Sequence, residues 1–421
     1  MSTLGNIQTQ AEEVVARCRT LSLFSEDSRS IRRTFLSPPM RDCHRELAKW
    51  LVAAGAEVTL DAAGNLRAFY AATESRAPRL LLGSHLDTVP NAGAYDGVLG
   101  VILAVALLES LERRKLPFGI EVVAFSEEEG VRFATPFIGS RALVGRLDKQ
   151  FLNCQDRNGI SIRNAIENFG LNPAEIPHAM IRQDTLAYLE FHIEQGPVLD
   201  SLKQPLGAVE AIAGQTRMEF LFLGHANHAG TTPMDLRRDA LTAAAEWILA
   251  VERIAQKDPG LLATVGRIEA KPGATNVIAG QARVSLDLRH RSDEIRVRAA
   301  AALRGLAEEI VERRGLTVRI SELLNQCAVE MDKFLVGEID NAMRSVGCQT
   351  HHMVSGAGHD AMILAEKVPA AMIFLRTPGG ISHDPAESVR TEDVAKAIEC
   401  GLRLLEQLAS SSEFQKRMCR A

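Results

Sequence analysis

Residues 79–97 read RLLLGSHLDTVPNAGAYDG, an apolar run that passes directly into a polar loop. The run Arg79–Leu82 predicts a buried strand, because a short apolar stretch bounded by turn residues is typical of one. The next segment, from Gly97 to about Lys115, predicts a helix with apolar residues spaced along one face. A buried strand that leads through a loop into a helix is the basic unit of an α/β fold.

Three further apolar runs of the same kind lie along the chain, each followed by polar residues. They are Ile120–Phe125 (IEVVAF), Ala187–Phe191 (AYLEF) and Ala371–Leu375 (AMIFL). Helical patterns alternate with these runs, which favours an α/β domain with a mainly parallel sheet.

A segment with a different hydrophobic periodicity interrupts this pattern. Apolar and polar residues alternate from about Arg217, as in a half-buried strand, and a helix is expected from about Arg238 to Ala255. Strands at Leu262–Ile268 and Ala282–Leu288 and a helix from about Asp293 to Arg314 complete a β-α-β-β-α order. We therefore expect an inserted α+β domain over 212–327, with 1–211 and 328–421 forming one discontinuous main domain.

The composition narrows the class of protein. The chain has 421 residues, of which 46% are apolar and 24% charged, and a net charge of −5, so a disordered chain, a fibre and a small disulfide scaffold are excluded. No basic run indicates nucleic-acid binding. The longest uncharged apolar run, Gly97–Leu108, is too short for a membrane span, and no secretory signal is expected at the N-terminus.

The cysteines point to a reducing compartment. All 7 are scattered, without C-x-x-C spacing, which is typical of reduced thiols in a cytoplasmic protein.

Residues that can bind a metal follow each of the four expected strands. The candidates are His85, Asp96, Glu129, His192 and His383. Because ligands gather at the carboxyl ends of strands in open α/β sheets, these distant segments can converge on one site. Imidazole and carboxylate ligands without thiolate suit Zn²⁺, Mn²⁺ or Co²⁺, and two ions can share the set if one carboxylate bridges them. A single histidine near a strand end is more often a satisfied surface or core residue than a metal ligand, and an acidic triplet alone is usually a solvated turn.

Two neighbours of these candidates have their own expected roles. Asp87 lies two positions after His85, so on an extended chain both face the same side, and Asp87 can orient the imidazole. The acidic triplet Glu127–Glu129 crowds three carboxylates after a strand, which allows one to hold metal while its neighbour shuttles a proton.

Seven ordered motifs from about Thr34 to Leu408 resemble the amidase/hydantoinase/carbamoylase family, whose members are dinuclear metal amidohydrolases related to di-zinc exopeptidases. The motifs are GSHLDTVPNAGAYDGVLGV, FSEEEGVRF, HIEQGPVLD, NHAGTTPM, TNVIAG with LDLRH, SGAGHDA and GISHDPAE. The resemblance implies a catalytic domain of the di-zinc exopeptidase type. It also implies that the inserted domain is a lid that forms a homodimer.

The resemblance assigns roles to matching positions. His85, Asp96 and His192 are expected to bind one ion, and Asp96, Glu129 and His383 a second, so that Asp96 bridges two divalent ions per subunit. Glu128 is expected to be the general base and acid. His228 is expected to reach the active site of the partner subunit as a catalytic and substrate-binding group. The expected contacts to a small ureido carboxylate substrate are Gln215, Asn276, Arg289 and the loop Gly356, Ala357 and Gly358.

Within the family, VVAFSEEEGVRF, PLGAVEAIAGQTR, SGAGHDAM and FLRTPGGISH are most similar to the branch that hydrolyses allantoate in purine catabolism. N-carbamoyl-L-amino-acid hydrolases and β-ureidopropionases share most of these motifs and stay open as alternatives. A catalytically silent scaffold on the same fold is the alternative outside enzymes. No G-x-S-x-G motif or Cys–His signal supports serine or cysteine catalysis.

Overall fold

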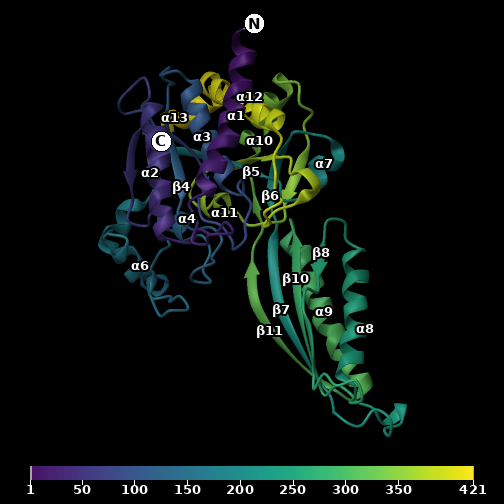
Figure 1. Cartoon of the computed structure of the whole chain (residues 1–421). Helices are drawn as coiled ribbons and strands as arrows, with labels where there is room; N and C mark the ends of the chain where they lie inside the picture. The colour runs from purple at the N-terminus through teal and green to yellow at the C-terminus, as the bar shows by residue number, and fades with distance from the viewer. Residues whose placement is uncertain (1, 421) are drawn as a thin grey trace. The chain divides into compact units, whose positions relative to one another are not determined.

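The structure of the chain, a computed structural model, describes residues 2–420. It forms two compact units, each with its own sheet and helices (Figure 1). The larger unit comprises Met1–Glu210, Met331–Met353 and Gly358–Ala421, and the smaller comprises Ala211–Glu330 with Val354–Ala357. In the part of the chain that is described, no helix has the length and apolarity needed to cross a bilayer.

The larger sheet has nine strands in the order β1-β2-β4-β3-β5-β14-β6-β12, with β13 beside β6. Their bounds are β1 Glu57–Leu60, β2 Leu66–Tyr70, β3 Arg79–His85, β4 Gly119–Phe125, β5 Thr185–Ile193, β6 Leu206–Ile212, β12 Val329–Glu330, β13 His352–Ser355 and β14 Ala370–Leu375. The four neighbours β4, β3, β5 and β14 run parallel, and β2 and β6 flank them antiparallel. The predicted mainly parallel α/β sheet is confirmed, and its four predicted strands are these four.

Burial explains why these strands are mainly apolar. Every residue of β4, β5 and β14 is buried, because helices cover both faces of a parallel sheet. The helix α3 (Val98–Ser110) packs on β3, β4 and β5, while α1 (Ser2–Ser22) and α12 (Thr391–Ser410) pack on α3. Since neighbours surround α3, its residues from Val98 to Leu108 are all buried. The helix predicted to reach Lys115 ends at Ser110, where the chain turns through left-handed Glu112 and Arg113.

Shorter elements complete the larger unit. The helix α11 (Asp360–Leu364) packs on β5, β14 and α4 (Ile138–Leu143), and α2 (Pro38–Ala53) packs on β1 and β2. The remaining helices are α5 Lys149–Leu152, α6 Ile162–Asn168, η1 Pro173–Ala179, α7 Val198–Leu202, α10 Lys333–Ser345, η3 Pro378–Gly380 and α13 Ser412–Arg420. Helices α6 and η1 share a small apolar core with Phe35 and Phe133.

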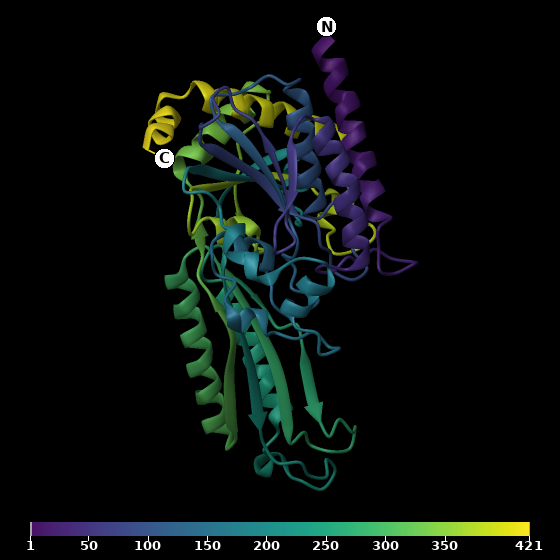
Figure 2. The same ribbon diagram turned by 90° about the vertical axis from the view of Figure 1, so that its left-hand side faces the viewer.

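The smaller unit is an antiparallel sheet packed against two long helices. The strand order is β11-β7-β10-β8, with β9 beside β10, and Figure 2 shows α9 alongside these strands. The bounds are β7 Gly214–Leu223, η2 Met234–Leu236, α8 Ala240–Ala255, β8 Leu262–Thr264, β9 Ile268–Lys271, β10 Gln281–His290, α9 Asp293–Arg314 and β11 Thr317–Gln326. Trp247 of α8 is fully buried and lies 4.2 Å from the ring of Phe220, which faces the core from β7.

The predicted β-α-β-β-α order was wrong in two places. The single strand predicted over Leu262–Ile268 is two short strands, β8 and β9, that pair with different parts of β10. A further strand, β11, follows α9 and was not predicted. Val318 and Ile320 of this strand pack against the core of the unit, while most of its other residues are exposed, as expected of an edge strand.

Candidate functional site

The expected metal ligands of the larger unit lie together at one edge of its sheet. His85 ends β3, His192 lies near the end of β5, and Glu129 follows β4. His383 belongs to the loop after β14 and has a left-handed φ of 57°, while Asp96 lies just before α3. Parallel strands bring their carboxyl ends to the same edge, so residues far apart in sequence become neighbours there.

Asp96 lies at the centre of this cluster. One of its carboxylate oxygens, Oδ1, lies 3.2 Å from Nε2 of His192 and 3.6 Å from Nε2 of His85. The other, Oδ2, lies 3.1 Å from Nε2 of His383, whose Nε2 is in turn 3.5 Å from Oε1 of Glu129. The two oxygens therefore face two different groups of ligands, as a bridging carboxylate does.

Backbone carbonyls set the tautomers of two of these histidines. Nδ1 of His85 lies 3.0 Å from the carbonyl oxygen of Asp87, and Nδ1 of His192 lies 2.9 Å from the carbonyl oxygen of Ile193. Because a carbonyl oxygen can only accept, each Nδ1 carries the proton and each Nε2 presents a lone pair. This is the tautomer that a metal-binding imidazole needs.

The donor set fits two divalent cations. The ligand atoms of His85, Asp96 and His192, and those of Asp96, Glu129 and His383, lie within 4.8 Å of one another in each group. Oδ1 of Asp96 is buried and has no hydrogen-bond partner among residues 2–420. A buried carboxylate oxygen without a partner is costly unless a cation neutralises it, so these clusters are candidate metal sites.

Close packing around the cluster requires glycine at position 97. A Cβ on Gly97 would lie 2.4 Å from the imidazole of His85, and the residue has a φ of +66°. Glycine adopts this conformation without strain and leaves room for the ring.

Asp87 holds the acidic segment in place. Its Oδ1 accepts the backbone N–H of Glu128 at 2.9 Å, and its Oδ2 accepts that of Glu129 at 3.1 Å. Oδ1 also lies 3.4 Å from Nδ1 of His85. Asp87 was expected to orient the imidazole of His85. In the structure it also binds the backbone of the segment that carries Glu128.

The crowded carboxylates perturb one another. Burial, and then the charge of Glu129, raises the pKa of Glu128 well above its ordinary value. Burial, and then the charge of Asp96, raises the pKa of Glu129 to about 7. Glu128 lies within 4.8 Å of the ligand atoms of His85 and Glu129 without belonging to the set around Asp96. A carboxyl with a raised pKa beside a candidate metal site is suited to carry a proton.

Two polar residues that sequence reasoning missed also fix Asp96. Nε2 of Gln195 donates to Oδ2 of Asp96 at 2.9 Å. Oε1 of Glu387 accepts the backbone N–H groups of Tyr95 and Asp96 at 2.8 and 3.1 Å. Both residues lie inside the quoted motifs HIEQG and HDPAE, which is the only signal that could have found them.

A second missed group lies behind His192. The ring of His359 is 4.5 Å from that of His192, and both residues, with Glu190, form a buried cluster. Glu190 accepts the hydroxyl of Ser84 and the backbone N–H of Ala361, each at 3.0 Å. These contacts tie the end of β5 to the start of α11.

The smaller unit brings together two of the expected substrate contacts. Gln215 of β7 and Arg289 of β10 are directly paired across the sheet. The guanidinium of Arg289 donates to both oxygens of Asp287, at 2.8 and 3.0 Å, and to the carbonyl oxygen of Gly356 at 2.6 Å. Asp287 also accepts from Arg217 at 3.0 Å, so two guanidinium groups share one carboxylate and leave a net positive charge.

The other expected contacts of the smaller unit lie in loops. His228 and Asn276 are exposed, and the backbone N–H of Ala229 donates to the carbonyl oxygen of Asn276. Nδ1 of His228 accepts the N–H of Gly230 at 3.2 Å, which leaves the proton of the neutral ring on Nε2.

In the expected substrate loop, Oγ of Ser355 accepts the N–H of Ala357. Gly358 belongs to the larger unit, where a Cβ would lie 2.9 Å from the ring of Phe137.

Known proteins resemble the chain over nearly its whole length. The model of peptidase family M20/M25/M40 matches residues 81–407. A probable allantoate deiminase of Oryza sativa subsp. japonica is 36% identical, covering 91% of this chain and 85% of that protein. An N-carbamoyl-L-amino acid amidohydrolase of Geobacillus stearothermophilus is 38% identical, covering 86% and 90%.

Among solved structures, an amidase of the hydantoinase/carbamoylase family from Burkholderia multivorans superposes with a TM-score of 0.89. It is 29% identical, covering 97% of this chain and 98% of that one.

Proposed function

The chain belongs to the peptidase family M20/M25/M40, and from that premise we propose that it is a metal-dependent amidohydrolase that cleaves a ureido C–N bond of allantoate. The observation that carries the proposal is the carboxylate of Asp96, one oxygen of which faces His85 and His192 while the other faces His383. A dinuclear hydrolase needs such a bridge together with a nearby base, and Glu128 stands within 4.8 Å of His85.

Five residues of the larger unit would hold the two ions of the proposed centre. One ion is assigned to His85, Asp96 and His192, and a second to Asp96, Glu129 and His383. The chemistry that such a pair supplies when bound is Lewis-acid polarisation of a carbonyl and acidification of water. Mn²⁺, Zn²⁺ and Co²⁺ all suit this donor set.

Glu128 moves the proton in the proposed reaction. Its carboxylate takes a proton from water as the water oxygen bonds to the ureido carbon. The same carboxyl then gives the proton to the departing nitrogen as the C–N bond breaks. The ureido carbon becomes a carbamate, which breaks down to ammonia and carbon dioxide. The amine released from the departing nitrogen is of the ureidoglycine type.

The smaller unit supplies the proposed substrate contacts. Arg289, with a planar fork of donors, suits the substrate carboxylate, and Gln215 beside it suits a polar ureido group. Asn276 and the backbone of Gly356, Ala357 and Gly358 add further donors. His228 offers its Nε2–H to the oxygen that becomes negative during attack. We propose that the chain forms a homodimer and that each active site receives His228 from the other copy. We place the enzyme in the cytoplasm, in keeping with its free cysteines.

A second candidate substrate is an N-carbamoyl-L-amino acid. The Geobacillus stearothermophilus relative named for that substrate is 38% identical, no less similar than the rice deiminase. The same centre would cleave the same bond in both substrates, so the mechanism does not separate them.

Ammonia release tests the function. The metal-stripped protein is resupplied with Mn²⁺, Zn²⁺ or Co²⁺ and offered allantoate, N-carbamoyl-L-amino acids and N-carbamoyl-β-alanine side by side. Metal-dependent turnover that is highest on allantoate supports the proposal. Higher turnover on a carbamoyl amino acid keeps the mechanism and replaces the substrate. A metal-loaded protein that turns over none of them refutes the proposal.

A further inference from the structure

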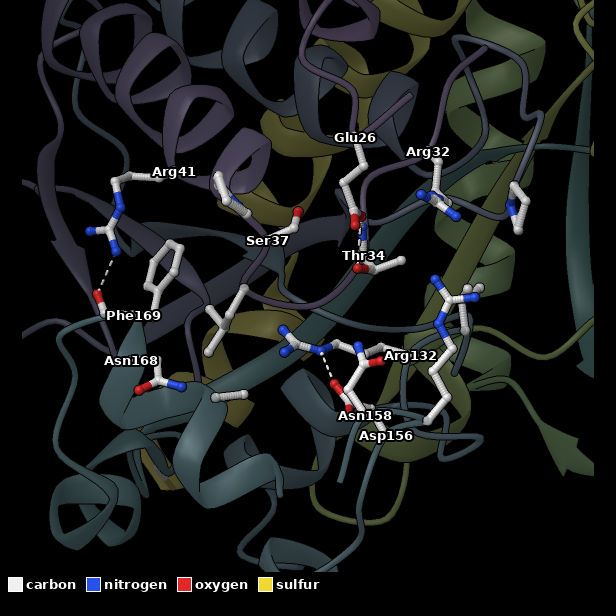
Figure 3. A pocket seen from close by; sticks show the side chains of 16 residues that line it. Glu26, Arg32, Thr34, Ser37, Arg41, Arg132, Asp156, Asn158, Asn168 and Phe169 are labelled. Carbon is white, nitrogen blue, oxygen red and sulfur yellow. Dashed lines mark hydrogen bonds and ion pairs between the residues drawn. The ribbon is translucent and has the colours of Figure 1, made fainter. Parts of the chain in front are cut away.

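One cavity in the larger unit is lined by none of the candidate metal ligands. It has a volume of about 530 Å³ and is lined by the segment around residues 26–41, by Val131 and Arg132 after the acidic triplet, and by α6 with its flanks. Volumes of this size are typical of sites for small molecules. Figure 3 shows Arg41 and Arg32 toward opposite ends of the cavity, with Ser37 and Arg132 between them.

Positive charge predominates in the lining. The charged side chains are four arginines, one glutamate and one aspartate, namely Arg32, Arg41, Arg132, Arg157, Glu26 and Asp156. Both acidic groups already have partners in the protein. Glu26 accepts the N–H and the hydroxyl of Thr34, each at 2.7 Å. Asp156 accepts Nε of Arg132 at 3.0 Å and two backbone N–H groups.

Two buried donors of the cavity lack partners within residues 2–420. Ser37 is 3% exposed, and its Oγ makes no hydrogen bond, although the residue precedes α2 where a side chain usually caps the helix. Nε of Arg32 is also buried without a partner. Donors left in this state are costly unless something accepts from them, so both point to an acceptor in the cavity.

The start of α2 adds a favourable field but few hydrogen bonds. Pro38 and Pro39 occupy its first two positions and have no N–H, and the N–H of Met40 bonds to the carbonyl oxygen of Ser37. The helix dipole still favours negative charge here. An anion bound at this point would therefore be held by side chains, chiefly the hydroxyl of Ser37 and the guanidinium groups.

Apolar side chains complete the lining. Leu36, Pro90, Val131, Ala165 and Phe169 are among them. The guanidinium of Arg41 lies 4.0 Å from the ring centre of Phe169 and donates to its carbonyl oxygen at 2.7 Å, so one end of the cavity is fixed. A bare inorganic anion would leave this apolar surface uncovered.

We propose that this cavity is a second ligand site, for a small organic oxyanion whose phosphate or carboxylate accepts from Ser37 and Arg32 and whose apolar body lies against Leu36 and Phe169. Arg157 adds positive charge, whereas Arg132 is already paired with Asp156. The planar fork of arginine suits either kind of oxyanion. None of the proposed metal ligands lines this cavity, so binding here can be measured separately from turnover at the metal centre.

Calorimetric titration of the metal-loaded protein tests the site. The probes are phenyl phosphate, benzoate, inorganic phosphate and phenol. We expect an aryl oxyanion to bind more tightly than inorganic phosphate, phenol not to bind, and binding to weaken with added salt. The tighter of phenyl phosphate and benzoate identifies the oxyanion. Binding of phenol as tight as that of the oxyanions would overturn the proposal.

Two cavity variants and one matched control separate this site from the metal centre. Ser37→Ala removes a hydroxyl that has no partner among the described residues, so thermal stability should hold while affinity falls about tenfold. Arg32→Gln with Arg157→Gln should cost at least as much affinity. Arg163→Gln changes an arginine of α6 that does not line the cavity, and it should bind like the wild type. Equal affinity in all of these proteins would place the oxyanion elsewhere and overturn the proposal.

Discussion

The carboxylate of Asp87 accepts the backbone N–H of Glu128 at 2.9 Å. This contact joins the loop after β3, which carries His85, to the segment after β4, which carries the proposed base. A one-residue shift of either loop would separate them, so the position of Glu128 relative to His85 depends on a residue that itself binds neither metal nor substrate.

Replacing Asp87 with asparagine should lower kcat by about 10- to 100-fold with little change in KM, since one of its two acceptor oxygens is lost. Steady-state kinetics at saturating metal measures the effect. Asp61→Asn is the matched control, because Asp61 also accepts two backbone N–H groups, those of Ala63 and Asn65, away from the cluster. That variant should lose stability and keep its kcat. A normal kcat in Asp87→Asn would leave Asp87 with a structural role only.

Glu128→Gln should reduce kcat by at least ~10², because glutamine keeps the shape of the side chain and cannot carry the proton. Metal content should stay at two ions per chain, since Glu128 is outside both assigned ligand sets. Kinetics and elemental analysis of the same preparation check both statements together. Near-normal turnover would refute the assignment of the base.

Asp96→Ala should remove both ions, whereas His383→Ala should remove only one. The reason is the geometry of Asp96, whose two oxygens face different ligand groups, at 3.2 Å from His192 and 3.1 Å from His383. Elemental analysis after dialysis distinguishes the two variants. An Asp96→Ala protein that retains two ions per chain contradicts a bridging role.

The expected metal ligands could be proposed from the sequence because buried parallel strands are mainly apolar runs, and the residues that end such runs meet at one edge of the sheet. His85 and His192 needed only that rule. Gln195 and Glu387 were missed because they contact Asp96 and Tyr95 across 99 and 292 positions of sequence. Only their positions inside the motifs HIEQG and HDPAE could have indicated these contacts.

In the smaller unit, one strand was predicted from the sequence and another was missed. The alternation of Met218, Phe220 and Phe222 predicted the strand β7, since burial of one face imposes a period of two, and these residues belong to the core of the unit. The edge strand β11 was missed because its alternating signal is short: Val318 and Ile320 pack against the core, while most of the other residues of the strand are exposed. Its place is set by pairing with β7, which is information carried by another segment.

Arg289→Ala should raise KM for a carboxylate substrate by about tenfold or more and change kcat less, as lost ground-state binding does. Arg217→Ala is the control, because Arg217 shares Asp287 with Arg289 at 3.0 Å but is not among the proposed substrate contacts. If Asp287 alone mattered, both variants would behave alike. Equal KM values in wild type and Arg289→Ala would leave Arg289 as a structural partner of Asp287.

His44 should make the protein sensitive to acid. The residue is 5% exposed on α2, and among the described residues neither ring nitrogen has a hydrogen-bond partner. Burial, and then the charges of Arg33 and Arg41, lowers the pKa of His44 to about 3. An unfolded chain binds the proton near pH 6.5, so between these values the unfolded state holds more protons and the free energy of unfolding falls as the pH falls.

The contribution of His44 is therefore complete above pH 6.5 and is lost progressively below it, by about 2 kcal/mol at pH 5. His44→Leu should unfold at the same or higher urea concentration at pH 7, because it removes two unpaired polar atoms, and should lose less stability between pH 7 and pH 5. His225→Leu, at an exposed position, matches the loss of one histidine and should keep the wild-type slope. Parallel pH profiles for wild type and His44→Leu would show that His44 does not set the acid sensitivity.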